Sequence, residues 1–408
     1  MSRSNKPAKS ANRKPSICVV GPGTKFLSGI SYYVYAQAEA LSGTFDTSSI
    51  LIRNMLPKFL YPGSKRVGKQ IANLSMPKNV PLFDGIDWFW LPSIFQAIWF
   101  LRKHHPDTLL IHWWTGTVLH SYLALAWAAR KMGIEVVIEF HESLDPGEQD
   151  RPLVAKYVNT FAPKLFAIAT KYTTHTEHDR MLIMERYGIA GTDITVIPLA
   201  TFENYAAQSD DAPVLEQRDR EDDGVIDLLY FGIIRPFKGV DDLVEAFDMM
   251  SPDEVSRYRL TVVGETWEGC DRPAELIAKS PYADRINFVN RYVTDEEVNR
   301  YFANTDMVVL PYHRSSQSGP LHVAMAYGLP IVITRVGGLV EGVEGYEGAV
   351  LTEAKNPSAL LESIRLATPL VGSAFTTTHT WAKVVDGYAS LAGIAATTTA
   401  TPERLHAA

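Results

Sequence analysis

Residues 227–247, DLLYFGIIRPFKGVDDLVEAF, decide the fold class of this chain. They begin with an apolar run that predicts a strand ending at Gly232. Beyond a short loop, apolar residues recur at helical spacing, at Val240, Leu243, Val244 and Phe247. A strand that passes through a glycine loop into a helix is the repeating unit of an open parallel sheet. The stretch therefore predicts an α/β fold.

The same unit recurs in both directions along the chain. Further strands are predicted at 260–263, 286–289, 307–310 and 331–334, and before the opening stretch at 17–20, 109–112, 136–140 and 195–198. Helices are predicted at about 32–41 and at 121–131. Because 408 residues exceed what one hydrophobic core usually supports, we expect two Rossmann-like domains, at 16–205 and 226–377.

Three segments have the composition of exposed chain. Residues 1–15 are basic and lack the apolar run of an export signal, so we expect a disordered tail. Residues 206–225 are mostly charged or small and are predicted to be the linker between the domains. Residues 395–408 are rich in Ala and Thr and are predicted to be a second disordered tail.

Composition restricts the partners and the compartment. The 39 basic and 46 acidic residues give a formal charge of -7, which does not attract nucleic acid phosphates. Cys18 and Cys270 lie far apart, and no histidine or cysteine set has zinc-ligand spacing, so we expect free thiols and no metal. These features favour a cytoplasmic protein.

Residues 88–101, WFWLPSIFQAIWFL, form the most hydrophobic stretch. They are too few to span a bilayer, and we favour a buried or half-buried helix that follows a loop. The alternative is a peripheral contact of residues 53–101 with the inner face of the plasma membrane. The tryptophans of this stretch and the basic residues that precede it, in a part of the chain (53–78) without acid, favour that alternative.

Two cations follow the glycine of the opening stretch. Arg235 and Lys238 stand three residues apart at the mouth of the predicted helix, beyond Gly232. Glycine allows a phosphate to approach the backbone, and N–H groups at a helix start attract anions. Arginine grips two oxygens while lysine supplies a mobile charge, so the pair suits a diphosphate. An exposed basic loop remains the alternative.

A second polar loop lies at the end of the predicted strand 307–310. Its candidate donor-binding residues are Ser316, Gln317, Ser318, Gly319 and Pro320. Pro320 suits the first turn of a helix, whose N–H groups would face an anion or sugar hydroxyls. A capped helix without a ligand is the alternative. Both loops follow strands of one predicted sheet, and open α/β sheets bind ligands at the carboxyl ends of their strands.

Residues 231–247 together with 286–343, INFVNRYVTDEEVNRYFANTDMVVLPYHRSSQSGPLHVAMAYGLPIVITRVGGLVEGV, closely resemble the donor domain of GT-B glycosyltransferases of family 4. The N-terminal half resembles the family more loosely, through GPGTKFLSGISYYV (21–34), VIEFHES (137–143), THTEHDRMLIMERYGI (174–189) and TVIPLA (195–200). The resemblance implies two domains that face a central cleft, retaining transfer from a nucleotide-diphosphate sugar without a metal ion, and a C-terminal helix, 378–394, that crosses back to the first domain.

The resemblance also implies roles for single residues. His141, Arg235 and Lys238 would be catalytic. The donor would be bound by Gly232, Arg235, Lys238, Arg291, Ser316, Gln317, Ser318, Gly319, Pro320 and Glu341. Ser28 and Gly29 would face the acceptor cleft. Two further candidates for this cleft come from their place in the sequence: His112, at a strand end beside two tryptophans, and Glu142, beside His141, for which a solvated loop is the alternative. His104, His105, His175 and His178 are expected to be surface or packing residues.

One departure from the family pattern affects the donor. The family commonly has two glutamates eight residues apart, where this chain has Ser315 and Val323, so the usual ribose anchor is missing. Three hypotheses stay open. The chain is a glycosyltransferase acting on a lipid-linked acceptor or a polysaccharide precursor, a nucleotide-sugar epimerase or phosphorylase on the same fold, or a catalytically silent scaffold.

Overall fold

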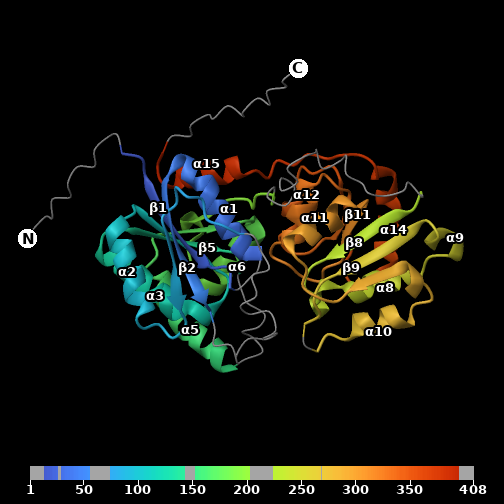
Figure 1. The fold of residues 1–408 in the computed structure, drawn as a ribbon, viewed down its shortest axis with the longest axis horizontal. Helices are drawn as coiled ribbons and strands as arrows, with labels where there is room; N and C mark the ends of the chain where they lie inside the picture. The colour runs from blue at the N-terminus through green and yellow to red at the C-terminus, as the bar shows by residue number, and fades with distance from the viewer. Residues whose placement is uncertain are drawn as a thin grey trace, which may run out of the picture.

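The computed structural model describes residues 13–25, 29–55, 74–142, 152–202, 224–267 and 269–394. These residues form two α/β units, each built around one parallel sheet (Figure 1). The predicted tail 1–15, the linker 206–225, the C-terminal tail and Ser28 lie wholly or mainly outside the described residues. Among the helices described, none has the length and apolar character needed to cross a membrane.

The N-terminal unit has seven strands in the order β3-β2-β1-β4-β5-β6-β7. They are β1 Ser16–Pro22, β2 Asp46–Asn54, β3 Leu82–Asp87, β4 Thr108–Trp113, β5 Glu135–Phe140, β6 Lys171–Thr174 and β7 Ile194–Val196. All neighbouring strands pair in parallel. The strand order reverses at β1, and this reversal is where a doubly wound sheet leaves a crevice at the carboxyl ends of its strands.

Helices cover both faces of this sheet, because the strand order runs in opposite directions from β1 and right-handed crossovers then lie on opposite faces. Helix α1, Gly29–Thr44, covers one face. The other face carries α2 Ser93–His104, α3 Leu119–Lys131, α5 Pro152–Phe166 and α6 Glu177–Tyr187. Alternate strand residues therefore pack into two separate apolar layers.

The C-terminal unit has six parallel strands in the order β10-β9-β8-β11-β12-β13. The strands are β8 Ile226–Phe231, β9 Tyr258–Val263, β10 Ile286–Val289, β11 Met307–Leu310, β12 Ile331–Thr334 and β13 Ala349–Thr352. The helices are α8 Val240–Asp248, α9 Pro252–Val255, α10 Arg272–Lys279, α11 Asp295–Ala303, α12 Gly319–Ala326, α13 Leu339–Gly342 and α14 Pro357–Ala367. Short 3-10 turns complete both units at 116–118, 191–193, 236–238, 283–285 and 368–370.

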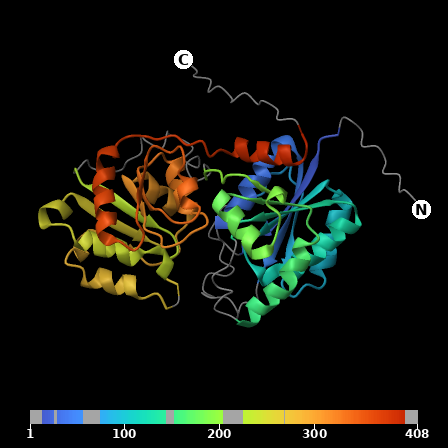
Figure 2. The same ribbon diagram turned by 180° about the vertical axis from the view of Figure 1, so that it is seen from behind.

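The last helix, α15 Trp381–Leu391, packs on the N-terminal unit although it follows the C-terminal one (Figure 2). Its Gly387 allows close contact with Ile197, because a Cβ there would lie 3.0 Å from the isoleucine side chain. The Tyr388 hydroxyl lies 3.3 Å from Thr173 Oγ1, and Lys171 Nζ donates to the Leu391 carbonyl over 2.7 Å. The chain thus connects the units twice.

The predicted α/β class is confirmed, and each predicted strand is present, three of them with the predicted ends and the others with ends that differ by at most two residues. Residues 88–101 are helical only from Ser93, and α2 is half-buried, as favoured. Its inner face is apolar and packed, whereas Phe95 and Trp99 are exposed. Much of the basic part of 53–101 lies outside the described residues, and Arg53 pairs with Asp84.

Candidate functional site between the two sheets

The loop after β8 is held against the end of β11 by a glycine. Gly239 has a φ of 65°, and a Cβ on it would lie 1.9 Å from the Pro311 carbonyl oxygen. Any other residue would collide with this backbone, so glycine is required here. The short turn Pro236–Lys238 therefore lies directly over the carboxyl end of the sheet.

The two predicted cations lie on this turn over aromatic rings. Lys238 Nζ is 3.7 Å from the centre of the Tyr312 ring, and the Arg235 guanidinium is 3.9 Å from the centre of the Trp267 ring. Burial lowers the pKa of Lys238 to about 8; Glu142 opposes this shift and Arg235 adds to it. A cation held in such surroundings gains most from an anion that enters beside it.

The polar loop before α12 continues the same wall. Ser318 caps α12 by accepting from Leu321 N over 3.3 Å, and its Oγ lies 3.3 Å from the Tyr312 hydroxyl. Tyr312 therefore joins the Lys238 turn to the start of α12. A Cβ on Gly337 would lie 2.0 Å from the Ser315 carbonyl oxygen, so a second glycine with positive φ, 53°, holds the loop in place.

The N-terminal unit contributes the facing wall. Ser316 Oγ donates to Glu142 Oε2 over 3.2 Å, and Glu142 is the second residue beyond the end of β5. The tyrosine hydroxyl of Tyr32, on α1, donates to the carboxylate of Asp295, on α11. Carboxyl ends of strands from both sheets thus enclose one polar region, which contains Arg235, Lys238, Glu142 and the polar loop.

Three histidines lie in one hydrogen-bonded chain behind Glu142. His175 Nδ1 is 3.0 Å from the Ile197 carbonyl oxygen, and His175 Nε2 is 3.1 Å from His141 Nδ1. His141 Nε2 is 2.7 Å from His112 Nδ1. All three rings are buried and pack edge-on against Tyr33. Both ring nitrogens of His141 therefore have partners within the protein.

The Ile197 carbonyl oxygen, at one end of the three histidines, decides which ring nitrogens donate and which accept. A carbonyl oxygen can only accept, so His175 Nδ1 carries a proton and, in the neutral ring, its Nε2 accepts. His141 Nδ1 then donates to His175, and its Nε2 accepts a proton from His112 Nδ1. Burial lowers the pKa of His112 to about 3 and of His175 to about 4, and that of His141 well below its usual range, which keeps the rings neutral.

A buried carboxylate lies beneath the histidines. Glu139 Oε1 accepts from the Tyr33 hydroxyl over 3.0 Å, and Oε2 accepts from Gln37 Nε2 over 2.9 Å. His112 Nδ1 lies 3.4 Å from Oε2. Burial raises the pKa of Glu139 to about 7, although the hydrogen bonds to its oxygens act in the opposite direction. Glu139 fixes the network from below but does not reach the polar region itself.

His112, Glu139 and His141 bring potential metal-ligand atoms within 4.8 Å of one another. Tetrahedral zinc with bonds of 2.0–2.1 Å to nitrogen would hold its ligand atoms about 3.4 Å apart. The 2.7 Å between His112 Nδ1 and His141 Nε2 is a hydrogen-bond distance instead. Asp241, Asp242 and His313 form a second group of potential metal ligands. There Asp242 pairs with His313 over 2.8 Å, and Asp241 pairs with Arg272 over 3.5 Å. We assign a metal to neither.

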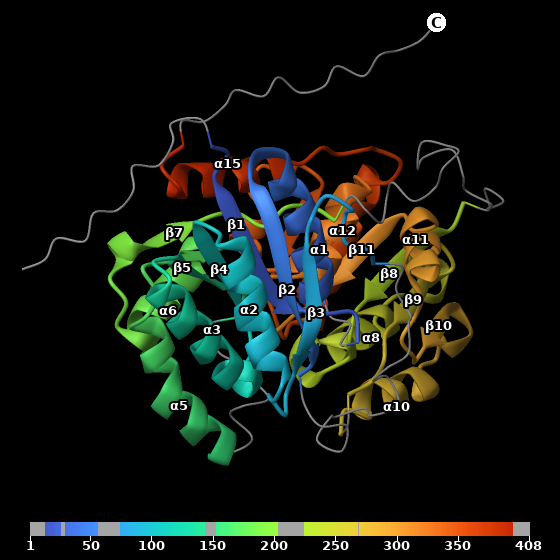
Figure 3. The same cartoon turned by 60° about the vertical axis from the view of Figure 1, so that its left-hand side comes forward.

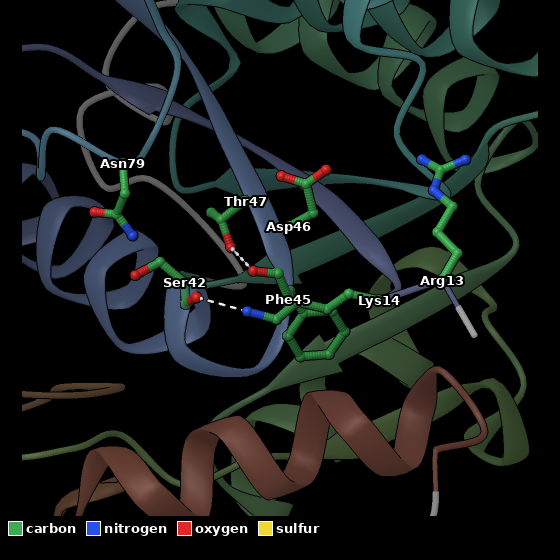
Figure 4. A pocket seen from close by; sticks show the side chains of 7 residues that line it. All are labelled: Arg13, Lys14, Ser42, Phe45, Asp46, Thr47 and Asn79. Carbon is green, nitrogen blue, oxygen red and sulfur yellow. Dashed lines mark hydrogen bonds between the residues drawn. The ribbon is translucent and has the colours of Figure 1, made fainter.

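A pocket of about 300 Å³ lies elsewhere, at the amino end of β2 (Figure 4). Its lining includes Lys14, whose Nζ donates to the Ser42 carbonyl over 3.0 Å, and Thr47, whose hydroxyl donates to Phe45. Ligands of open α/β sheets bind at the opposite edge. None of the predicted site residues lines this pocket.

Glu341 joins the two units in a way that the sequence does not suggest. Its carboxylate accepts from Glu177 N over 2.7 Å and from His178 N over 2.8 Å, at the start of α6. Thr176 Oγ1 accepts from the third amide, Asp179 N, over 3.0 Å. The first N–H groups of a helix lack intrahelical partners, so the C-terminal unit satisfies two of them. Glu341 was predicted to bind the donor, and here both of its oxygens serve this contact.

Replacing Glu341 with alanine is therefore expected to loosen the contact between the units. Loss of an N-terminal carboxylate typically costs about 0.5–2 kcal/mol. Chemical denaturation should show this loss, and small-angle X-ray scattering should show a larger radius of gyration. The exposed Glu344→Ala is the matched control. Unchanged curves for both variants would contradict the role of Glu341.

The other predicted residues lie as follows. Arg291 Nη1 donates to Glu297 Oε2 over 2.9 Å at the exposed start of α11. Gln317 Oε1 is 3.4 Å from His322 Nε2. Gly319 and Pro320 open α12, and a Cβ on Gly232 would lie 3.5 Å from Pro320 Cγ. Gly29 opens α1.

Two family models match this chain. The model described as Glycosyltransferase Family 4 matches residues 27–201, and the model described as Glycosyl transferases group 1 matches residues 226–367. Together they cover both walls of the polar region and every strand of the two sheets except β1. The chain belongs to the family 4 glycosyltransferases.

Curated relatives of this family 4 chain are more distant. It is 27% identical to the D-inositol 3-phosphate glycosyltransferase of Acidothermus cellulolyticus over 62% of this chain and 60% of that protein. It is 33% identical to the GDP-mannose:glycolipid 4-beta-D-mannosyltransferase of Xanthomonas campestris pv. campestris over 26% of this chain and 29% of that protein. The chain thus spans about three fifths of the length of the first of these relatives.

Solved structures share the whole GT-B fold at low identity. Sucrose-phosphate synthase from Thermosynechococcus elongatus superposes with a TM-score of 0.61 at 16% identity, over 91% of this chain and 92% of that one. Anabaena HepE, solved in complex with UDP, superposes with a TM-score of 0.56 at 15% identity, over 93% and 94%. The predicted GT-B architecture is confirmed.

Five further residues of this family 4 chain form the polar network, and the sequence interpretation missed them. Glu139 supplies the buried carboxylate, Tyr33, Gln37 and Tyr388 surround it, and His175 continues the histidine chain. His175 was expected at the surface or in packing; it is buried and hydrogen-bonded at both nitrogens. A signal existed in Glu139, because a carboxylate inside the apolar strand VVIEF requires buried partners.

Proposed function

We propose that this chain transfers a sugar from a nucleotide-diphosphate sugar to an acceptor hydroxyl, with retention of configuration and without a metal ion. One observation carries the proposal. Arg235 and Lys238 lie beside the start of α12 on one wall, and Glu142 lies on the opposite wall. Two cations and a helix start suit a diphosphate, and a facing carboxylate suits sugar hydroxyls.

In the proposed reaction the bond between the anomeric carbon and the diphosphate oxygen breaks. The acceptor oxygen forms its bond to the anomeric carbon on the same face, and its proton passes to the departing phosphate oxygen. Arg235 and Lys238 stabilise the charge that develops on the leaving diphosphate. The partial desolvation of Lys238 strengthens this interaction, because a less hydrated cation attracts an anion more strongly.

The relatives support the class of donor. Family membership, the UDP complex of HepE and the names of the curated relatives all favour a nucleotide sugar. Val323 packs in the core of the C-terminal unit and has no polar side-chain atom, so it cannot accept the ribose hydrogen bonds of the missing carboxylate. We propose a carbohydrate or lipid-linked acceptor, such as a polysaccharide precursor, and transfer in the cytoplasm at the inner face of the plasma membrane.

A donor screen tests the proposal. The protein is incubated with UDP-, GDP- and ADP-sugars, with and without candidate acceptors, and mass spectrometry identifies the nucleoside diphosphate released. Release that depends on an acceptor supports transfer. Conversion without an acceptor would favour the epimerase or phosphorylase hypothesis. A thermal shift with nucleoside diphosphates but no turnover of any donor would favour the silent scaffold.

Nucleoside diphosphate affinity is expected to fall above about pH 8. Lys238 in the free protein has a pKa lowered to about 8, and only its protonated form attracts the diphosphate. Bound diphosphate raises that pKa. The affinity should therefore fall about tenfold per pH unit between the pKa of Lys238 in the free protein and its higher pKa in the complex. Isothermal titration across this range measures the slope. Lys238→Arg should remove it, since arginine stays charged; a slope that persists would assign the titration to another group.

A further inference from the structure

Three helices on one face of the N-terminal sheet carry positive charge and no acid. Helices α2, α3 and α5 pack side by side on that face (Figure 3). Their residues include no Asp or Glu, in a chain whose formal charge is -7. Their exposed cations are Arg102, Lys103, Arg130, Lys131, Lys156 and Lys164. The charge of these three helices is therefore opposite in sign to that of the whole chain.

The same three helices repeat one arrangement near their C-terminal ends. Lys103 Nζ lies 5.5 Å from the centre of the Trp99 ring, and Lys131 Nζ lies 5.7 Å from that of Trp127. Lys164 Nζ lies 4.7 Å from the ring centre of Phe161. We call these six residues the Lys–aromatic edge. Helices that connect parallel strands run antiparallel to them, so all three pairs lie at the amino edge of the sheet, away from the cleft.

Large apolar side chains on this face are exposed. Trp99 is 64% exposed and Trp127 is 58% exposed. Phe95 at 64% and Leu153 at 84% extend the surface along α2 and α5. Single exposed apolar residues are ordinary on soluble proteins. Here they lie on three helices that carry six exposed cations and no acid, whereas the acids of this face lie on α6. Exposed aromatic rings among cations are typical of surfaces that meet the headgroup layer of a membrane.

We propose that the Lys–aromatic edge docks on the surface of an anionic phospholipid bilayer. The tryptophans would enter the headgroup region, where an apolar ring with a polar N–H is favoured. The lysine stems would lie along the rings while their ammonium groups meet lipid phosphates. The Lys–aromatic edge is positively charged and would repel the same edge of a second copy of this chain. This repulsion favours an anionic lipid surface as the partner. The docking does not depend on the proposed reaction.

Vesicle sedimentation without any donor tests the docking. The full chain is mixed with vesicles of phosphatidylcholine alone or of phosphatidylcholine with phosphatidylglycerol. Binding to the anionic vesicles only is expected. Replacing Lys103, Lys131 and Lys164 with glutamine should weaken it about 100-fold, since each basic residue near an anionic surface contributes about fivefold. The matched control replaces the exposed Lys279, Lys355 and Lys383 with glutamine and should bind like the wild type.

A second variant separates insertion from charge alone. Trp99→Ser with Trp127→Ser keeps every cation and should also lose binding at least tenfold, because the apolar contribution is gone. Circular dichroism checks that each variant is folded. Equal loss in the control lysine variant, or no binding of the wild type, would overturn the proposal. So would self-association in sedimentation velocity that Trp99→Ser and Trp127→Ser abolish without lipid. None of these outcomes bears on sugar transfer, which the donor screen measures separately.

Discussion

Replacing Lys238 with alanine is expected to lower kcat/KM for sugar transfer by roughly 100- to 1,000-fold, the usual effect of removing one group that stabilises developing charge. Lys238 is half-buried over the Tyr312 ring, and Arg235 lies beside it. Its ammonium group is thus held where the leaving diphosphate would carry its charge. Most of the loss should appear in kcat, because the charge grows as the bond breaks.

Steady-state kinetics with the donor found by the screen measure this effect. Arg235→Ala should cause a loss of similar order, whereas Lys238→Arg should retain part of the activity because it keeps the charge. Lys279→Ala is the matched control, since that lysine is exposed on α10. If Lys238→Ala raises only KM, the residue binds the donor without stabilising the transition state. Unchanged kcat/KM would refute the diphosphate site.

The second large effect is a loss of stability in mild acid. Burial lowers the pKa of His112, His175 and His322 to about 3, 4 and 3, and that of His141 also falls. Below about pH 6.5, their ordinary pKa, these histidines bind protons in the unfolded chain but not in the folded chain. Each buried histidine therefore removes up to about 1.4 kcal/mol of stability per pH unit as the pH falls from about 6.5.

Glu139 acts in the opposite direction. Its folded pKa is raised to about 7, so its contribution is present at low pH and is lost as the pH rises through that value. Four histidines outweigh one carboxyl group. We expect the free energy of unfolding to fall by roughly 3–4 kcal/mol per pH unit between about pH 6 and pH 5.

Chemical denaturation at several pH values measures that slope. His322→Gln should flatten it by about 1.4 kcal/mol per pH unit, because one buried proton acceptor is removed. His178→Gln, at an exposed histidine, is the control and should leave the slope unchanged. Glu139→Gln should steepen it. A slope that is the same in all four proteins would show that other groups cause the acid transition.

The alternation of apolar runs and helical patterns was enough to predict the α/β class. Three strands of the N-terminal sheet, β2, β3 and β6, were not predicted. Strand β3, LFDGID, and strand β6, KYTT, are short or mix polar with apolar residues. These strands form because pairing with neighbouring strands supplies what the local sequence lacks, on one side for the edge strand β3 and on both sides for β6.

For the candidate site, local sequence indicated the donor wall. Its chemistry could be predicted from two short stretches of sequence. One contains Gly232, Gly239 and the two cations, and the other is the polar loop at 316–320. The roles predicted for single residues in binding and catalysis remain predictions. For Glu341 and His141 the structure adds contacts that no local pattern contains. Glu341 accepts from His178, 163 residues away, and His141 contacts His112 and His175, which are 29 and 34 residues away.

The sequence by itself determined the two α/β units, the glycine-supported turn that carries Arg235 and Lys238, and the capped start of α12. These features depend on residues close together in the chain, where spacing and backbone preference suffice. Only the tertiary structure decided that Glu142 faces Ser316, that Glu341 caps a helix of the other unit, and that Glu139 lies under three histidines. Those contacts exist because parallel strands from distant segments end at one edge, a relation that depends on strand order in space.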